Sequence, residues 1–241
     1  MNQGPAPPDV IILGGWSPGP LLYLKDFLAS NQCRIVELQI PMPPIPGSWC
    51  LDKAVCGTIG ILILMIFGLA LHASDLHWFL FAFIVFPIWF RILAVIVVRV
   101  SIKQGIQIAL QAIRESEGRE TILVGFSWGA AVLGEMVALG MIGRSDQPLA
   151  LLIAPTSSLV ASVAKQRDAA LRIRHSCNSN RVFVVHGTAD HTFCPNQERW
   201  QDTGASLHYL VDNHVFMRHP SQRQLINIAG SILRSTESQA F

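Results

Sequence analysis

The chain has 241 residues, of which 51% are hydrophobic and only 14% are charged, and its net charge is +2. This composition excludes a disordered chain, a collagen-like fibre and a highly basic nucleic-acid-binding protein, and it fits one or two folded domains. Five scattered cysteines form no CxxC pair and no zinc-ligand spacing: Cys33, Cys50, Cys56, Cys177 and Cys194. We therefore expect reduced thiols, no disulfide framework, no metal and no cofactor.

Short apolar runs alternate with helix-like stretches along most of the chain, which predicts an α/β fold with a mostly parallel sheet of about six strands and flanking helices. The candidate strands are Val10–Leu13, Arg34–Gln39, Thr121–Val124, Leu149–Ala154, Arg181–His186 and Ser206–Val211. Apolar residues at helical spacing, from Ile102 to Ile113 and from Leu225 to Ile232, predict helices that pack on this sheet. The α/β domain comprises residues 1–53 and 101–241.

Residues 54–100 form a hydrophobic insert between the second and third strands. They contain only three charged side chains, Asp75, Arg91 and Arg99. Ala54–Leu71 is an uncharged run of 18 residues, and as a helix it is roughly 27 Å long, close to the ~30 Å hydrocarbon core of a bilayer. After a polar break, Trp78–Val98 gives a second apolar run. We predict a helical hairpin embedded in a membrane, with both flanks on the same, reducing side.

Other arrangements of this insert stay open at the level of sequence. Two buried core helices, or a lid hairpin on the bilayer surface, are supported by Arg91, because an arginine at mid-bilayer costs about 2.5–3.5 kcal/mol. A long arginine side chain can also reach the interface, which leaves a full double crossing and a re-entrant hairpin both open.

A G-x-S-x-G pentapeptide follows the third predicted strand and precedes a helical run of small residues: Gly125, Phe126, Ser127, Trp128 and Gly129. A serine in a sharp strand-to-helix turn can act as a nucleophile, and flanking glycines avoid a collision of Cβ atoms with the neighbouring strand or helix. The pentapeptide by itself also fits a glycine turn without any chemistry.

A serine nucleophile needs a general base, and the base needs an acid that holds its tautomer. Asp190 follows the fifth predicted strand through a glycine turn, and His214 follows the sixth strand. Functional residues of open parallel sheets gather at the carboxyl ends of the strands. We therefore expect Ser127, Asp190 and His214 to meet at one edge of the sheet.

Neighbouring residues compete for some of these roles. His191 and His219 are alternative bases, and Asp212 is an alternative acid, although its position at a strand end favours a turn-forming role. We expect His186, inside a strand end, to make a structural hydrogen bond, and Cys194 to be a small packing residue.

These motifs resemble those of the α/β-hydrolase superfamily, over the whole chain outside residues 54–100. The resemblance is carried by ILGGWSPGP, VGFSWGAAV, VVHGTADHTFCP and VDNHVF. It implies Ser127 as nucleophile, Asp190 as acid and His214 as general base. The first motif matches the oxyanion loop, with Gly14-Gly15 where members of the family often have His-Gly, and it implies an oxyanion hole made by the backbone N–H groups of Trp16 and Trp128. The Trp128 side chain either lines the acyl pocket or packs on the sheet.

The resemblance and the insert together predict a membrane-anchored serine esterase, lipase or thioesterase. Pro155–Asn180, where many hydrolases of this fold carry a cap, is too short for a large one. The insert at 54–100 would instead hold the site near a bilayer, which favours amphiphilic acyl substrates and no nucleic-acid partner. The alternative is a hydrolase-derived structural subunit of a membrane complex, with partners in that complex and an idle triad.

Overall fold

The computed structural model describes residues 8–15, 19–41, 76–116, 119–173, 177–178 and 180–237, with the side chains of 76–87 and 90 left aside. The chain divides into two compact units, Met1–Met42 with Val100–Phe241, and Pro43–Arg99. Trp16 and the first predicted apolar run, Ala54–Leu71, lie outside the described residues.

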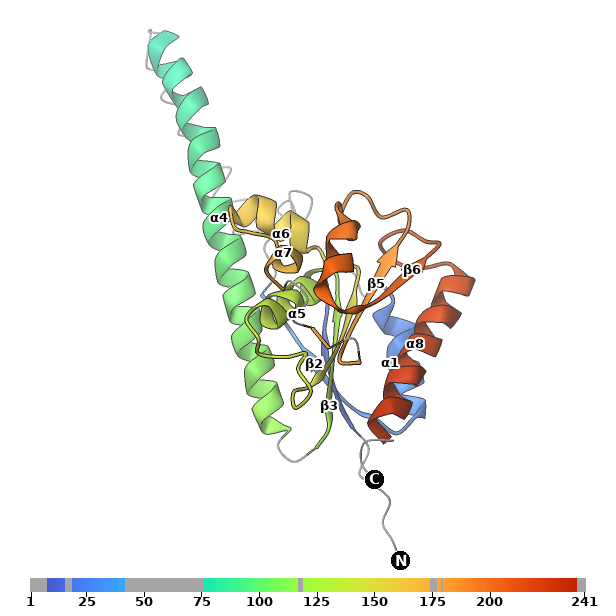
Figure 1. Cartoon of the computed structure of the whole chain (residues 1–241). Coiled ribbons are helices and arrows are strands. Elements are labelled where there is room, and N and C mark those ends of the chain that lie inside the picture. Colours follow the sequence, from blue (N-terminus) through green and yellow to red (C-terminus); the bar gives the residue numbers. More distant parts are fainter. Residues whose placement is uncertain are drawn as a thin grey trace, which may run out of the picture. The chain divides into compact units, whose positions relative to one another are not determined.

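The first unit is built on a six-stranded parallel sheet with the order β2-β1-β3-β4-β5-β6 (Figure 1). Its strands are β1 (Asp9–Leu13), β2 (Arg34–Leu38), β3 (Thr121–Phe126), β4 (Leu149–Ile153), β5 (Val182–Gly187) and β6 (Ser206–Leu210). All six predicted strands are confirmed, with ends that differ by at most two residues. Every residue of β1, β3 and β4 is buried, as expected where helices cover both faces of a parallel sheet.

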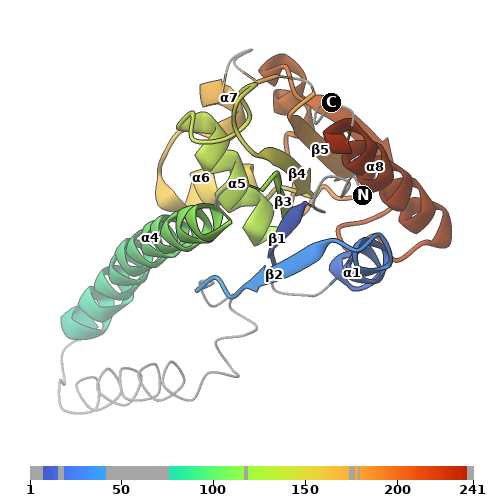
Figure 2. The ribbon, with the colours of Figure 1, turned by 90° about the horizontal axis from the view of Figure 1, so that it is seen from below.

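Helices cover the two faces of this sheet, as Figure 2 shows. On one face, α1 (Leu21–Ser30) and α8 (His219–Glu237) contribute leucines and isoleucines to the main buried cluster. On the other face, α5 (Trp128–Ala138) packs on β3 and β4. Two short helices, α6 (Ser157–Ala164) and α7 (Ala169–Ile173), contact α5 and occupy the segment that the sequence predicts to be too short for a large cap. A 3₁₀ helix, η1 (Gln197–Thr203), contacts α7.

The longest helix, α4 (Leu76–Glu115), begins in the second unit and ends in the first. In the first unit its buried stripe consists of small residues and one isoleucine: Ser101, Ile102, Gly105, Ala109 and Ala112. Ile106 and Ile113, which the helical pattern places on the buried face, are only half-buried. The small side chains let the helix approach closely, since a Cβ on Gly105 would lie 2.9 Å from Val132 of α5.

The described part of the second unit is the beginning of α4, from Leu76 to Arg99. It confirms that the second predicted apolar run is helical, and it exposes large apolar side chains: Ile88, Trp89, Ile92, Leu93 and Ile96. Among the described residues, one helix, Arg91–Glu115, is long and apolar enough to cross a membrane, a test that a core helix of a soluble protein also passes. The predicted hairpin itself therefore stays a prediction.

Candidate active site

Ser127 occupies the turn between the end of β3 and the start of α5, with φ 54° and ψ −107°. This backbone conformation is strained for a residue with a side chain and is found mainly where surrounding structure enforces it. Both flanking glycines are required by close packing. A Cβ on Gly125 would lie 2.7 Å from the backbone nitrogen of Ala130, and one on Gly129 would lie 2.1 Å from the carbonyl oxygen of Leu13. The turn thus holds Ser127 at the carboxyl edge of the sheet.

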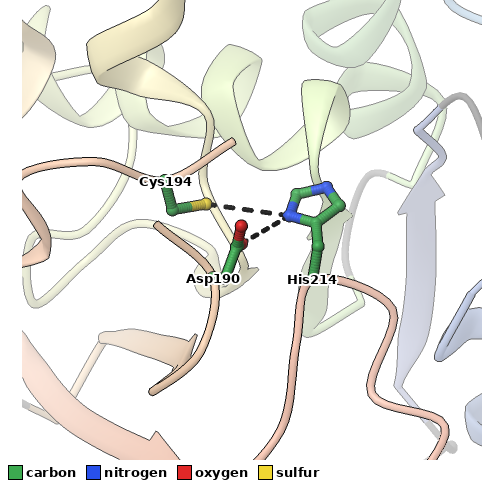
Figure 3. Close-up of side chains that lie close together, drawn as sticks. All are labelled: Asp190, Cys194 and His214. Carbon is green, nitrogen blue, oxygen red and sulfur yellow. Dashed lines mark hydrogen bonds and ion pairs between the residues drawn. The ribbon is translucent and has the colours of Figure 1, made fainter. Parts of the chain in front are cut away.

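The structure brings the three residues singled out in the sequence into one hydrogen-bonded series. Nε2 of His214 lies 2.8 Å from Oγ of Ser127, and Nδ1 of His214 lies 2.5 Å from Oδ2 of Asp190. Figure 3 shows the second of these contacts. Asp190 follows β5 and His214 follows β6, so both loops leave the same sheet edge as Ser127. This geometry allows a proton to pass from Ser127 to His214 while Asp190 holds the other ring nitrogen.

Asp190 is a buried carboxylate with several donors around it. Burial on its own raises the pKa of Asp190, but hydrogen bonds from His214 and Cys194, the charge of His214 and the backbone N–H of Phe193 together outweigh burial. The Phe193 N–H lies 3.2 Å from Oδ1. The pKa of Asp190 is therefore held below its usual range, and the carboxylate is ionised at neutral pH.

Cys194 is more than the small packing residue that the sequence predicts. Its Sγ lies 3.9 Å from Nδ1 of His214 (Figure 3). Its thiol is also hydrogen-bonded to Asp190. Burial, with the nearby charge of Asp190, raises the pKa of the Cys194 thiol well above its ordinary value, which keeps the sulfur protonated. The only signal of this contact in the sequence is the position of Cys194 four residues after Asp190.

Asp190, Cys194 and His214 each have an atom that could bind a metal, and these three atoms lie within 4.8 Å of one another. The spacing of cysteines and histidines in the sequence does not predict this group. Nitrogen and oxygen ligands of one tetrahedral zinc ion stand about 3.3 Å apart, given metal–ligand bonds of about 2.0–2.1 Å. The 2.5 Å between Asp190 and His214 is shorter than this. The pair is spaced as hydrogen-bond donor and acceptor rather than as two ligands of one ion.

The loop after β1 lies against Ser127. A Cβ on Gly15 would lie 2.7 Å from Cβ of Ser127 and 3.3 Å from its Oγ. Trp16, the next residue, lies outside the described residues, so its part in an oxyanion hole stays a prediction. The Trp128 side chain is buried, 2% exposed, and its indole Nε1 donates to Oγ of Ser101 at 3.0 Å. Of the two roles considered for this ring, the structure favours packing over lining a pocket.

The competing residues have other surroundings. Asp212 accepts the backbone N–H groups of Asn213 at 2.8 Å and Arg218 at 2.9 Å, so it shapes the loop that carries His214. His191 and His219 are exposed. The predicted structural hydrogen bond of His186 is wrong, because neither of its ring nitrogens has a partner within the described part of the chain.

His186 is instead held by packing. It is 1% exposed and stacks on Tyr209 of the neighbouring strand, with ring centroids 5.8 Å apart. Burial lowers the pKa of His186 to about 4, against a smaller opposing effect of Asp190, so the ring is neutral at physiological pH.

Two phenylalanine rings lie beside the imidazole of His214. Phe193 and Phe126 lie with their ring centroids 4.7 Å and 5.4 Å from that of His214. Phe126 is fully buried, whereas Phe193 is partly exposed. Val211 and Met217, on the loop that carries His214, are also exposed apolar residues. Apolar rings therefore lie beside the His214 imidazole, in addition to its polar contacts with Ser127 and Asp190.

No family model and no curated protein matches this sequence. Solved structures do resemble it, among them a putative hydrolase from Agrobacterium vitis S4, with 16% identity over 96% of this chain and 91% of that chain and a TM-score of 0.53. An esterase from Pyrococcus furiosus is 11% identical over 96% of this chain and 83% of that chain, with a TM-score of 0.54. A structure of the metagenome-derived lipolytic enzymes LipS and LipT is 10% identical over 96% of both chains, with a TM-score of 0.55. The fold is that of the α/β-hydrolases.

Proposed function

We propose that this protein is a serine hydrolase that cleaves carboxylic esters or thioesters through an acyl-enzyme on Ser127. The observation that carries the proposal is the series Ser127 Oγ to His214 Nε2 at 2.8 Å and His214 Nδ1 to Asp190 at 2.5 Å. Among the structures that share this fold, an esterase and lipolytic enzymes belong to the same reaction class.

Each residue of the series has a defined role in the proposed reaction. Oγ of Ser127 attacks the acyl carbon while Nε2 of His214 takes its proton, and the ionised Asp190 holds Nδ1–H and stabilises the imidazolium. His214 then gives this proton to the leaving alcohol or thiol. Water, activated by His214 in turn, releases the acid and restores the Ser127 hydroxyl.

The negative charge on the acyl oxygen needs donors that are already in place. We assign them to the backbone N–H groups of Trp16 and Trp128. Trp128 is the first residue of α5, so its N–H lies at the positive end of a helix. The close approach of Gly15 to Ser127 supports the assignment, because Gly15 is the residue that precedes Trp16 in the chain.

We further propose that the enzyme is anchored to a membrane through residues 54–100, with both flanks on the same, reducing side, and that its substrates are amphiphilic acyl compounds. The described second unit supports anchoring, since α4 exposes a series of large apolar side chains there. The rings of Phe193 and Phe126 beside His214, and the exposed apolar residues Val211 and Met217 on the loop that carries it, support an acyl substrate.

A fluorophosphonate probe, which reacts with activated serines, tests the reaction. We expect the full chain in detergent to be labelled, Ser127→Ala to abolish labelling, and Ser157→Ala, which removes another buried hydroxyl, to leave it intact. Absence of labelling in a correctly folded wild type would reject the enzyme and favour a hydrolase-derived structural subunit of a membrane complex.

Carbonate extraction tests the anchor separately. We expect the full chain to stay in the membrane pellet and a variant lacking residues 54–100 to be released. Equal release of the two proteins would contradict membrane anchoring without bearing on the chemistry of Ser127.

A further inference from the structure

The two connections of the apolar second unit are hydrogen-bonded to each other inside the first unit. The second unit comprises Pro43–Arg99, so the chain leaves the first unit shortly after Pro41 and returns at Val100. The hydroxyl of Ser101, one residue after the return, donates a hydrogen bond to the carbonyl oxygen of Pro41. The point of exit and the point of return are thereby fixed to one another.

The hydroxyl of Ser101 is also hydrogen-bonded to Trp128, the residue that follows Ser127. The indole Nε1–H of Trp128 donates to Oγ of Ser101 at 3.0 Å. A serine hydroxyl donates one hydrogen bond and accepts two, so Ser101 can accept from Trp128 and donate to Pro41 at the same time. Ser101 is 4% exposed and Trp128 is 2% exposed, and water therefore does not replace the bond between these two side chains without an unfavourable opening of the structure.

Packing beside this series is tight. Gly105, one helical turn after Ser101, lies where a Cβ would stand 2.9 Å from Val132 of α5 and 3.0 Å from Ile40. The exit from β2, helix α4 and helix α5 are therefore in direct contact at this level. Close-packed elements transmit a displacement to their neighbours instead of absorbing it.

We propose that Ser101 is a positioning residue, which couples the apolar unit to the oxyanion side of the active site through the indole of Trp128. The inference rests on the proposed function, in which the backbone N–H of Trp128 stabilises the acyl oxygen. A change in the lipid surroundings of the second unit acts on its two connections, and Ser101 passes that change to the first turn of α5. Turnover at Ser127 then depends on the surroundings of a unit that takes no part in the chemistry.

The test compares wild type, Ser101→Ala and Ser101→Thr as full chains, in detergent micelles and in phosphatidylcholine vesicles. The measurements are kcat and KM with a short, soluble acyl ester, the rate of fluorophosphonate labelling, and the melting temperature. We expect wild-type kcat to differ between micelles and vesicles. We expect Ser101→Ala to lower kcat about tenfold at unchanged KM and to remove this difference, because the two bonds of the hydroxyl are lost. Ser101→Thr, which restores a hydroxyl, should recover both properties.

Three results would overturn the inference: a wild-type kcat that is equal in micelles and vesicles, a wild-type kcat in Ser101→Ala, or a variant that melts earlier but keeps the wild-type difference between the two environments. If Ser101→Ala does not fold, Trp128→Phe removes the indole donor, keeps the bond between Ser101 and Pro41, and is measured in the same way. Failure of the proposed function is distinguishable, since the wild type would then not be labelled at all.

Discussion

The close approach of Gly15 to the nucleophile allows a prediction with a matched control. A Cβ at Gly15 would lie 2.7 Å from Cβ of Ser127 and 3.0 Å from the carbonyl oxygen of Phe126. A Cβ at the adjacent Gly14 would meet nothing closer than Leu21, at 3.9 Å, which is an ordinary contact. Gly15→Ala and Gly14→Ala therefore add the same methyl group to neighbouring residues, and only the first methyl group collides with the site.

The expected loss of activity follows from how far the loop or the serine must move to remove the collision. Ordinary contacts begin at 3.4 Å, so the loop or the serine must move by about 0.7 Å in Gly15→Ala. The elbow around Ser127 is held by β3 and α5, and we expect the loop to retreat. A displacement of about 1 Å at a reacting centre costs about 100-fold in rate, and loss of one oxyanion donor costs about 100- to 1000-fold. We expect kcat of Gly15→Ala to fall about 100-fold and that of Gly14→Ala to change little.

The assay is kcat with a soluble acyl ester, together with the rate of fluorophosphonate labelling and the melting temperature of each variant. Equal activities of Gly15→Ala and Gly14→Ala would refute the reasoning, because the loop would then not lie against Ser127 as the structure places it. A loss of activity in Gly15→Ala that is matched by its loss of folded protein would refute it as well.

Asp190→Asn should lower kcat on the order of 10⁴-fold, because a neutral amide can donate to Nδ1, which favours the wrong tautomer of His214, and does not stabilise the imidazolium. Asp212→Asn should keep most of the activity, and similar losses in both variants would contradict our assignment of the acid. Burial lowers the pKa of His186 from its ordinary value of 6.5 to about 4 in the folded protein, so only the unfolded chain binds a proton at this residue between these two pH values. The free energy of unfolding should fall by up to about 3 kcal/mol as the pH drops from 6.5 to 4, and His186→Phe should flatten this decline in urea denaturation. If the free energy of unfolding falls equally with pH in wild type and His186→Phe, His186 is not the source of the decline. Cys194, with its raised pKa, should react with iodoacetamide at neutral pH only after unfolding, and peptide mass spectrometry on the native protein would reveal any earlier modification.

Most of the sheet could be predicted from the sequence. Most strands contain a short aliphatic run followed by a turn or a helix start, which predicts a buried strand. Every residue of β1, β3 and β4 is buried, whereas β2 and β6 at the two edges of the sheet are only partly buried. The burial of α4 could not be predicted in the same way. Large apolar residues at helical spacing point to Ile106 and Ile113, but the buried stripe runs through Gly105, Ala109 and Ala112. Small residues contribute little to a hydrophobic pattern in the sequence. They are buried in α4 because they allow two helices to approach closely.

The elbow and the two loops after β5 and β6 are visible in the sequence because each follows a strand directly. Their side chains meet because parallel strands end at a common edge. The partners of His186 and Cys194 could not be read in this way. His186 is buried without a hydrogen bond in the described structure, and Cys194 bonds to Asp190. Whether a buried polar group finds a partner depends on neighbouring strands and loops, which local sequence does not specify.

Local composition and the turns that end each strand are enough to predict the order of the strands along the chain and the apolar insert at 54–100. They also identify Ser127, Asp190 and His214 as candidate site residues. The folded chain is needed to see that Asp190, rather than Asp212, is hydrogen-bonded to His214. It is also needed to see that Ser101 is hydrogen-bonded to both Pro41 and Trp128. Both outcomes depend on distances between segments far apart in the chain. Such distances are set by the contact of α4 with α5, by the packing of α5 on β3 and β4, and by the common edge of the parallel strands.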